Sequence, residues 1–77
     1  MTPIVLSKDV RAFKKINGGS KMDRVDESFS RGTSIVVGEP CFLTYKNRSR
    51  LVLAVIGTDA FLMAEEIGTL DDRKLRD

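Results

Sequence analysis

The segment 50–56 constrains the fold more than any other, because every position after its first is apolar. It reads R-L-V-L-A-V-I, and a strand places successive side chains on opposite faces. A sheet that faces water on one side would alternate apolar and polar residues instead. Both faces of this strand must therefore be covered. A partner subunit would be the simplest cover, and a closed small barrel with a loop folded over it is the alternative.

Short apolar runs elsewhere in the chain predict an all-β fold with short helices. We expect a five-stranded antiparallel sheet whose strands are residues 3–6, 34–37, 41–46, 50–56 and 60–64. The breaks between the later strands are rich in turn-forming residues and fall at 38–40, 47–49 and 57–59. These connections are too short for crossover helices, so consecutive strands should pair antiparallel as a meander.

The stretch after the first strand has a different character. Apolar residues at positions 10, 13 and 16 recur at helical spacing, so residues 8–16 are expected to be helical and to end at Asn17-Gly18. Residues 20–31 are mostly polar and are expected to form a mobile loop. If this loop were packed instead, Met22 and Phe29 would be its core contacts. Near the other end, Thr69 with Asp72 resembles a capping box, which predicts a short helix over 70–76.

Size and cysteine content point to one small cytoplasmic domain. The chain has 77 residues, which suits a single domain with a thin core that could be shared in an oligomer. Cys41 is the only cysteine, so no internal disulfide can form, as is usual in a reducing compartment. We expect it to be a buried small residue. No segment approaches the ~20 apolar residues that span a bilayer, so we expect no membrane partner.

The residue types argue against catalysis. The chain has no histidine, which excludes a histidine general base or metal ligand. One cysteine cannot build a zinc site. Gly18-Gly19 is not followed by the G-K-[ST] of a phosphate-binding loop. Glu65 and Glu66 are adjacent, so in a strand they could not act as a pair. We expect a binding protein without cofactor or metal, and not an enzyme.

Charge alone is uninformative, but its distribution is uneven. The formal net charge is +2, from 13 basic and 11 acidic residues, which does not by itself indicate a nucleic-acid partner. Residues 8–24 carry an excess of basic side chains and residues 65–77 an excess of acidic ones. Two solvated faces would account for this equally well.

Four segments, in order, match a known pattern. Residues 4–8 read I-V-L-S-K, 32–39 read G-T-S-I-V-V-G-E, 51–55 read L-V-L-A-V and 61–67 read F-L-M-A-E-E-I. They resemble L-I-L-T-R, G-E-S-hydrophobic-x-I-G-D, V-R-I-G-V and V-x-V-x-R-E-E-I of the carbon storage regulator (Rsm) family. Members of that family are RNA-binding translational repressors. The resemblance covers residues 3–8 and 31–68.

The resemblance implies a homodimer in which the first and fifth strands are exchanged between subunits, with a C-terminal helix. Such a dimer would cover strand 50–56. It also implies a post-transcriptional regulator that blocks or modulates translation by binding GGA-type sites in mRNA, or a small regulatory RNA. The RNA-binding surface would combine residues of the first strand with residues of the partner's fifth strand: Leu6, Ser7 and Lys8, with Met63, Ala64 and Glu65.

The chain departs from the family pattern at four places. Ala64 stands where the family has an arginine that is central to RNA binding. Losing one arginine–base contact costs about 1–3 kcal/mol. The family's basic pair becomes Lys8-Asp9, residues 9–30 are an insertion, and the glycine-rich loop shrinks to residues 47–49.

Basic residues near the insertion are candidates to restore RNA binding. On the expected helix, Arg11, Lys14 and Lys15 would lie beside Lys8 and contact phosphates, and Arg31 is a further candidate. The insertion could equally block the site or dock a protein. The alternative function is therefore an interaction protein that has lost RNA binding and acts through a regulatory protein or antagonises a family member.

Overall fold

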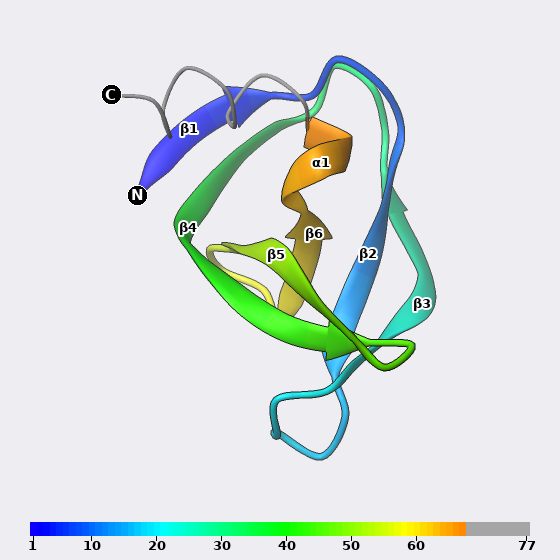
Figure 1. The fold of residues 1–77 in the computed structure, drawn as a ribbon. Coiled ribbons are helices and arrows are strands. Elements are labelled where there is room, and N and C mark those ends of the chain that lie inside the picture. Colours follow the sequence, from blue (N-terminus) through cyan, green and yellow to red (C-terminus); the bar gives the residue numbers. More distant parts are fainter. Residues whose placement is uncertain (68–77) are drawn as a thin grey trace.

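The computed structural model describes residues 1–67, which form one antiparallel sheet and one short helix. In chain order the elements are β1 (Thr2–Val5), β2 (Val10–Lys15), β3 (Met22–Phe29), β4 (Ser34–Tyr45), β5 (Arg48–Val55), β6 (Ala60–Met63) and α1 (Ala64–Ile67). The strand order is β1-β4-β5-β6-β2-β3 (Figure 1). The prediction of a mostly β, antiparallel protein is confirmed, but the sheet has six strands rather than five. The helix expected over 70–76 lies outside the described residues.

The second half of the chain forms the expected meander of β4, β5 and β6. One long strand replaces the two that were predicted over 34–37 and 41–46. The segment between them is a bulge, where the register with β5 shifts between Val37 and Pro40. The turn into β5 comes earlier than predicted, at Lys46-Asn47, whose φ values of 51° and 64° fit a type I′ hairpin turn. Cys41 on β4 is exposed rather than buried.

The predictions of a helix over 8–16 and a loop over 20–31 are wrong, because β2 and β3 pair there as a hairpin. Asn17 and Gly18 have φ values of 52° and 71°, and the Gly19 N–H donates to the Ile16 carbonyl at 3.1 Å. Asn-Gly is the sequence that a type I′ hairpin turn favours. The helix-like spacing arises from a register shift between Arg11 and Phe13, which interrupts the alternation that would otherwise indicate a strand.

This hairpin covers part of the second face of β5. Adjacent residues on β5 are buried in different clusters. Val52 packs in the cluster that also contains Phe13, Met22, Leu43 and Met63. Leu53 and Val55 pack on the other face, with Leu6, Val10, Ile35, Val37, Leu62, Ala64 and Ile67. The inserted segment thus supplies cover for which the sequence predicts a partner, and the homodimer stays a prediction.

The sheet curls so strongly that the far end of β4 meets the turn of the β2–β3 hairpin. The first residues of β4 pair with β1, and the later ones pair with β5. At the far end of β4, the Thr44 N–H donates to the Ser20 carbonyl at 2.8 Å, and Lys21 forms an isolated bridge with Thr44. The hairpin β2–β3 therefore lies against the end of β4, on the side of the molecule away from β1 (Figure 1).

Candidate nucleic-acid interface

The structure buries some residues of the RNA-binding surface that the resemblance implies and leaves others exposed. Leu6, Met63 and Ala64 lie in the core with at most 6% of their surface exposed. Leu6 and Ala64 pack in one apolar cluster, and Met63 packs in the other, where it also lines a recess at the surface. Ser7 and Lys8 are exposed in the connection between β1 and β2.

That connection lies beside the one between β3 and β4 (Figure 1). The Gly32 N–H donates to the Leu6 carbonyl at 2.8 Å, and the Arg31 N–H donates to the Asp9 carboxylate at 2.7 Å. Lys8 and Arg31 are both exposed. The structure thus places two of the predicted cations together at the tips of neighbouring loops.

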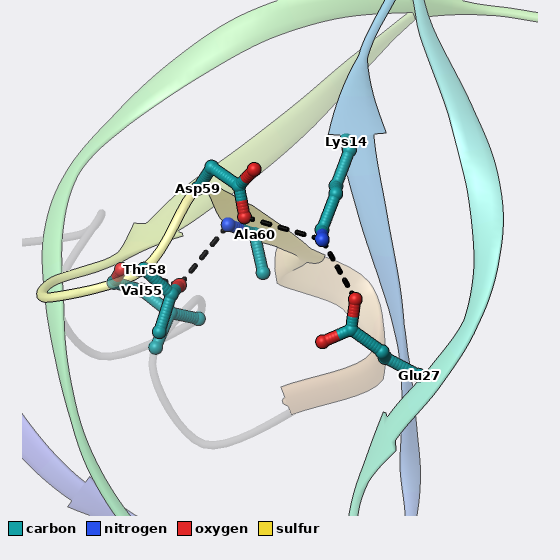
Figure 2. A network of polar contacts seen from close by, with 6 residues as sticks. All are labelled: Lys14, Glu27, Val55, Thr58, Asp59 and Ala60. Atoms are coloured by element: carbon teal, nitrogen blue, oxygen red, sulfur yellow. Dashed lines mark hydrogen bonds and ion pairs between the residues drawn. The ribbon is translucent and has the colours of Figure 1, made fainter.

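Lys14 and Lys15 do not share a face as predicted, because β2 is a strand and its successive side chains point to opposite sides. The Lys14 Nζ lies 2.7 Å from the Glu27 Oε1 and 3.3 Å from the Asp59 Oδ1 (Figure 2). These hydrogen bonds, the one to Glu27 first, raise the pKa of Lys14 above its ordinary value. Lys14 is therefore already engaged by two carboxylates. The Lys15 Nζ lies 5.6 Å from the centre of the Phe61 ring.

The turn that carries Asp59 is itself held by hydrogen bonds. The Thr58 hydroxyl donates to the Val55 carbonyl at 2.9 Å and accepts from the Ala60 N–H at 3.0 Å (Figure 2). Asp59 consequently faces Lys14 from a fixed turn, and the ion pairs join β2 and β3 to the start of β6. This arrangement points to a structural role for Lys14 rather than a phosphate contact.

A groove between the hairpin and the end of β4 contains an aromatic ring next to cations. Tyr45, the last residue of β4, is half-buried and meets Phe13 edge-on, with ring centres 5.1 Å apart and planes at 74°. The Lys46 Nζ lies 5.3 Å from the centre of the Tyr45 ring. Packing on Phe13 fixes the orientation of Tyr45, and the Lys46 ammonium lies over one face of the Tyr45 ring.

Three arginines from different strands line the same groove. Arg11 on β2, Arg24 on β3 and Arg50 on β5 join Tyr45 around a recess of about 300 Å³. Arg11, Arg24 and Tyr45 also line an adjoining open groove of about 740 Å³, with Lys46. Carboxylates also line the groove. One of them, Glu65, accepts a hydrogen bond from Arg50.

The floor and walls of the smaller recess differ in chemistry. Phe13 and Met63 contribute apolar surface, the arginines contribute positive charge, and Glu65 with Glu66 contributes acceptors. An aromatic ring can stack on an unpaired base, guanidinium groups can bind phosphate, and carboxylates can accept from base N–H groups. The groove thus offers the group types that single-stranded nucleic acid requires, and of its lining residues Arg11, Met63 and Glu65 were predicted.

Sequence reasoning missed Arg24, Tyr45, Lys46 and Arg50, because they are distant along the chain. Only the curl of the sheet and the hairpin bring them together. One available signal was that Tyr45, the single tyrosine, directly precedes a lysine and an asparagine in a turn. An aromatic residue at a hairpin tip is well placed to contact a ligand.

The described part of the chain gives few other chemical indications. Residues 1–67 hold no group of three or more acidic, cysteine or histidine side chains placed to bind a metal. Within the same range, no helix has the length and apolar character to cross a membrane. Comparisons with protein-family models, with curated proteins and with solved structures found no match to this chain.

Proposed function

We propose that this protein binds single-stranded RNA in the groove formed by Arg11, Arg24, Tyr45, Lys46 and Arg50, and acts as a post-transcriptional regulator. The observation that carries the proposal is the position of Tyr45. Its half-buried ring is fixed against Phe13 and has cationic side chains from β2, β3 and β5 around it. A base stacked on such a ring contributes about 1–3 kcal/mol.

The charges of the groove favour binding to an irregular single strand over binding to a regular duplex. Its lining also holds carboxylates, namely Asp9, Asp23, Asp26, Glu27, Glu65 and Glu66, so the phosphates of a uniform duplex would meet repulsion as well as attraction. A single strand can place phosphates on Arg11 and Arg24 and turn a base toward Glu66. The regulatory role, through GGA-type sites that control translation, is supported by the resemblance of the four segments to the carbon storage regulator family.

The experiment measures the binding of a hairpin RNA with a GGA loop, and of the same hairpin with a scrambled loop, by fluorescence anisotropy. Two double variants each remove two exposed positive charges: Arg11→Ala with Arg24→Ala in the groove, and Lys8→Ala with Arg31→Ala at the loop tips. We expect the groove variant to lose at least about tenfold more affinity, because its cations act beside the stacking ring. The loop variant should retain most of the binding.

The relative losses of affinity in the two double variants show whether the RNA binds in the groove or at the loop tips. Equal losses for the two double variants would indicate binding by overall charge alone, and a larger loss for the loop variant would place the RNA on the loop tips. Preference for the GGA loop would favour a sequence-reading regulator, whereas equal binding of both hairpins would favour an unselective single-strand binder.

The second candidate is an interaction protein without RNA binding. The burial of Leu6, Met63 and Ala64 favours it, because half of the surface that the resemblance implies is then used for packing. If the native chain binds neither hairpin at low salt, this second function replaces the first.

A further inference from the structure

The turn between β2 and β3 and the turn between β4 and β5 lie together at the end of the molecule away from β1 (Figure 1). The Thr44 N–H donates to the Ser20 carbonyl at 2.8 Å, and Lys21 forms a bridge with Thr44. The first turn is also closed within itself, because the Ile16 N–H donates to the Lys21 carbonyl at 2.9 Å. The backbones of the two turns are therefore held side by side.

Three exposed cations lie on these turns: Lys21, Lys46 and Arg48. Arg48 pairs with Tyr45 across the β4–β5 ladder, and residues paired in this way have neighbouring side chains on one face of the sheet. Arg48 therefore lies next to Tyr45, whose ring also has the Lys46 ammonium over it. We call Lys21, Lys46 and Arg48 the turn cluster.

The turn cluster differs from the groove in its charge. Residues 10–22 and 40–58, which include both turns, contain no aspartate or glutamate. The ion pairs among residues 1–67 involve Lys14 and Arg50 and none of the three turn cations. The lining of the groove, by contrast, holds several carboxylates. A chain of phosphates would therefore meet more uniform attraction at the turns than along the groove.

A recess of about 230 Å³ joins the turn cluster to the groove. It is lined by residues of both turns, including Lys21 and Asn47. It shares Asp23, Tyr45 and Lys46 with the open groove of about 740 Å³. Asp23 is the one carboxylate among its described lining residues. A strand that enters the groove and stacks a base on Tyr45 can thus continue along this recess between the turns.

We propose that the RNA strand continues from Tyr45 onto the turn cluster, which binds the phosphates of the adjacent nucleotides. This path begins in the proposed RNA groove and so rests on that function. It specifies the substrate as an RNA with a single-stranded extension on one side of the stacked base. Phosphate contacts position a strand without reading its sequence, so the extension adds affinity and not selectivity. An extension on the opposite side would meet the carboxylates of the groove and should gain little.

The test uses fluorescence anisotropy with unstructured RNAs of about four and about twelve nucleotides that share one GGA core. The longer RNA is made in two forms, extended on the 5′ side or on the 3′ side. We expect one form to bind the native chain at least about tenfold more tightly than the short RNA, because it adds phosphate contacts. The turn variant, Lys21→Ala with Arg48→Ala, should lose this gain and bind the short RNA as the native chain does.

The matched control is Lys8→Ala with Arg31→Ala, which also removes two exposed positive charges and should keep the gain. The salt dependence of binding to the native chain gives a measurement that does not depend on variants folding. The slope of the logarithm of the binding constant against that of the salt concentration should be steeper by about 1.4 for the favoured long RNA, from two added phosphate contacts at ~0.7 each.

The path over the turns is contradicted by equal gains for the 5′ and 3′ forms, by no gain for either, or by a gain that survives in the turn variant. Failure of the proposed function has a different signature. In that case Arg11→Ala with Arg24→Ala leaves the affinity for the short RNA unchanged, and the path over the turns loses its starting point as well.

Discussion

Ala64 begins α1 with 6% of its surface exposed and packs in the cluster that contains Leu53 and Ile67. The family pattern has an arginine at this position. In this fold, an arginine would have to place its charged group among apolar side chains or distort the start of α1. The alanine therefore fits the packing of this chain, and the charge that the pattern would supply here has to come from elsewhere on the surface.

We predict that Ala64→Arg destabilises the protein and does not create a stronger RNA site. Overpacking alone costs about 1–3 kcal/mol, and the buried charge adds to that cost. Urea unfolding measures the free energy of unfolding, with Ser28→Arg as the control, because Ser28 is exposed on β3. An Ala64→Arg variant as stable as this control would show that position 64 can face solvent.

Lys14 gives a prediction with a definite pH dependence. Its pKa is raised in the folded protein by the hydrogen bonds to Glu27 and Asp59, so folding favours the protonated amine. The stabilisation is complete below the ordinary lysine pKa of about 10.4 and is lost as pH rises through the higher folded value. Lys14→Met should therefore lower the Tm at neutral pH, and the difference from the native protein should shrink at strongly alkaline pH. A difference that stays constant would show that the ion pairs contribute nothing.

At the scale of elements, the meander was predictable and the hairpin was not. The continuous apolar run of segment 50–56 and the turn at residues 57–59 locate β5 and β6 within two residues of their observed ends. In β2, the register shift at Arg11 leaves Ala12 and Phe13 buried side by side, which hides the strand period. Asn17-Gly18 indicates a hairpin only if both flanking segments are already known to be strands.

The turn of this hairpin can be tested with two neighbouring glycines. Gly18 has a φ of 71°, whereas Gly19 has no positive φ and an added Cβ would meet only the Ile16 carbonyl, at 3.6 Å. We predict that Gly18→Ala costs about 1–2 kcal/mol, the cost of a left-handed conformation for alanine. Gly19→Ala should be close to neutral. Thermal unfolding of both variants checks this, and equal effects would contradict the type I′ turn.

At the scale of the whole molecule, the inserted hairpin has two consequences. It covers part of one side of β5 with Phe13 and Met22, and it forms one wall of the groove with Arg11 and Arg24. The sequence alone could suggest the basic character of residues 8–24 but not which cations meet Tyr45, because that depends on how far the sheet curls. One short hairpin therefore contributes both to the core and to the surface groove.

The position of the RNA on the folded chain tests this account most directly. Amide NMR spectra of the isotopically labelled native protein, recorded while the GGA-loop hairpin RNA is added, would report every affected residue at once. We predict that the largest shifts occur at Arg11, Arg24, Tyr45 and Lys46, with small shifts at Lys8 and Arg31. Shifts concentrated along β1 and the two loop tips, or a spectrum unchanged by the RNA, would contradict the groove as the binding site.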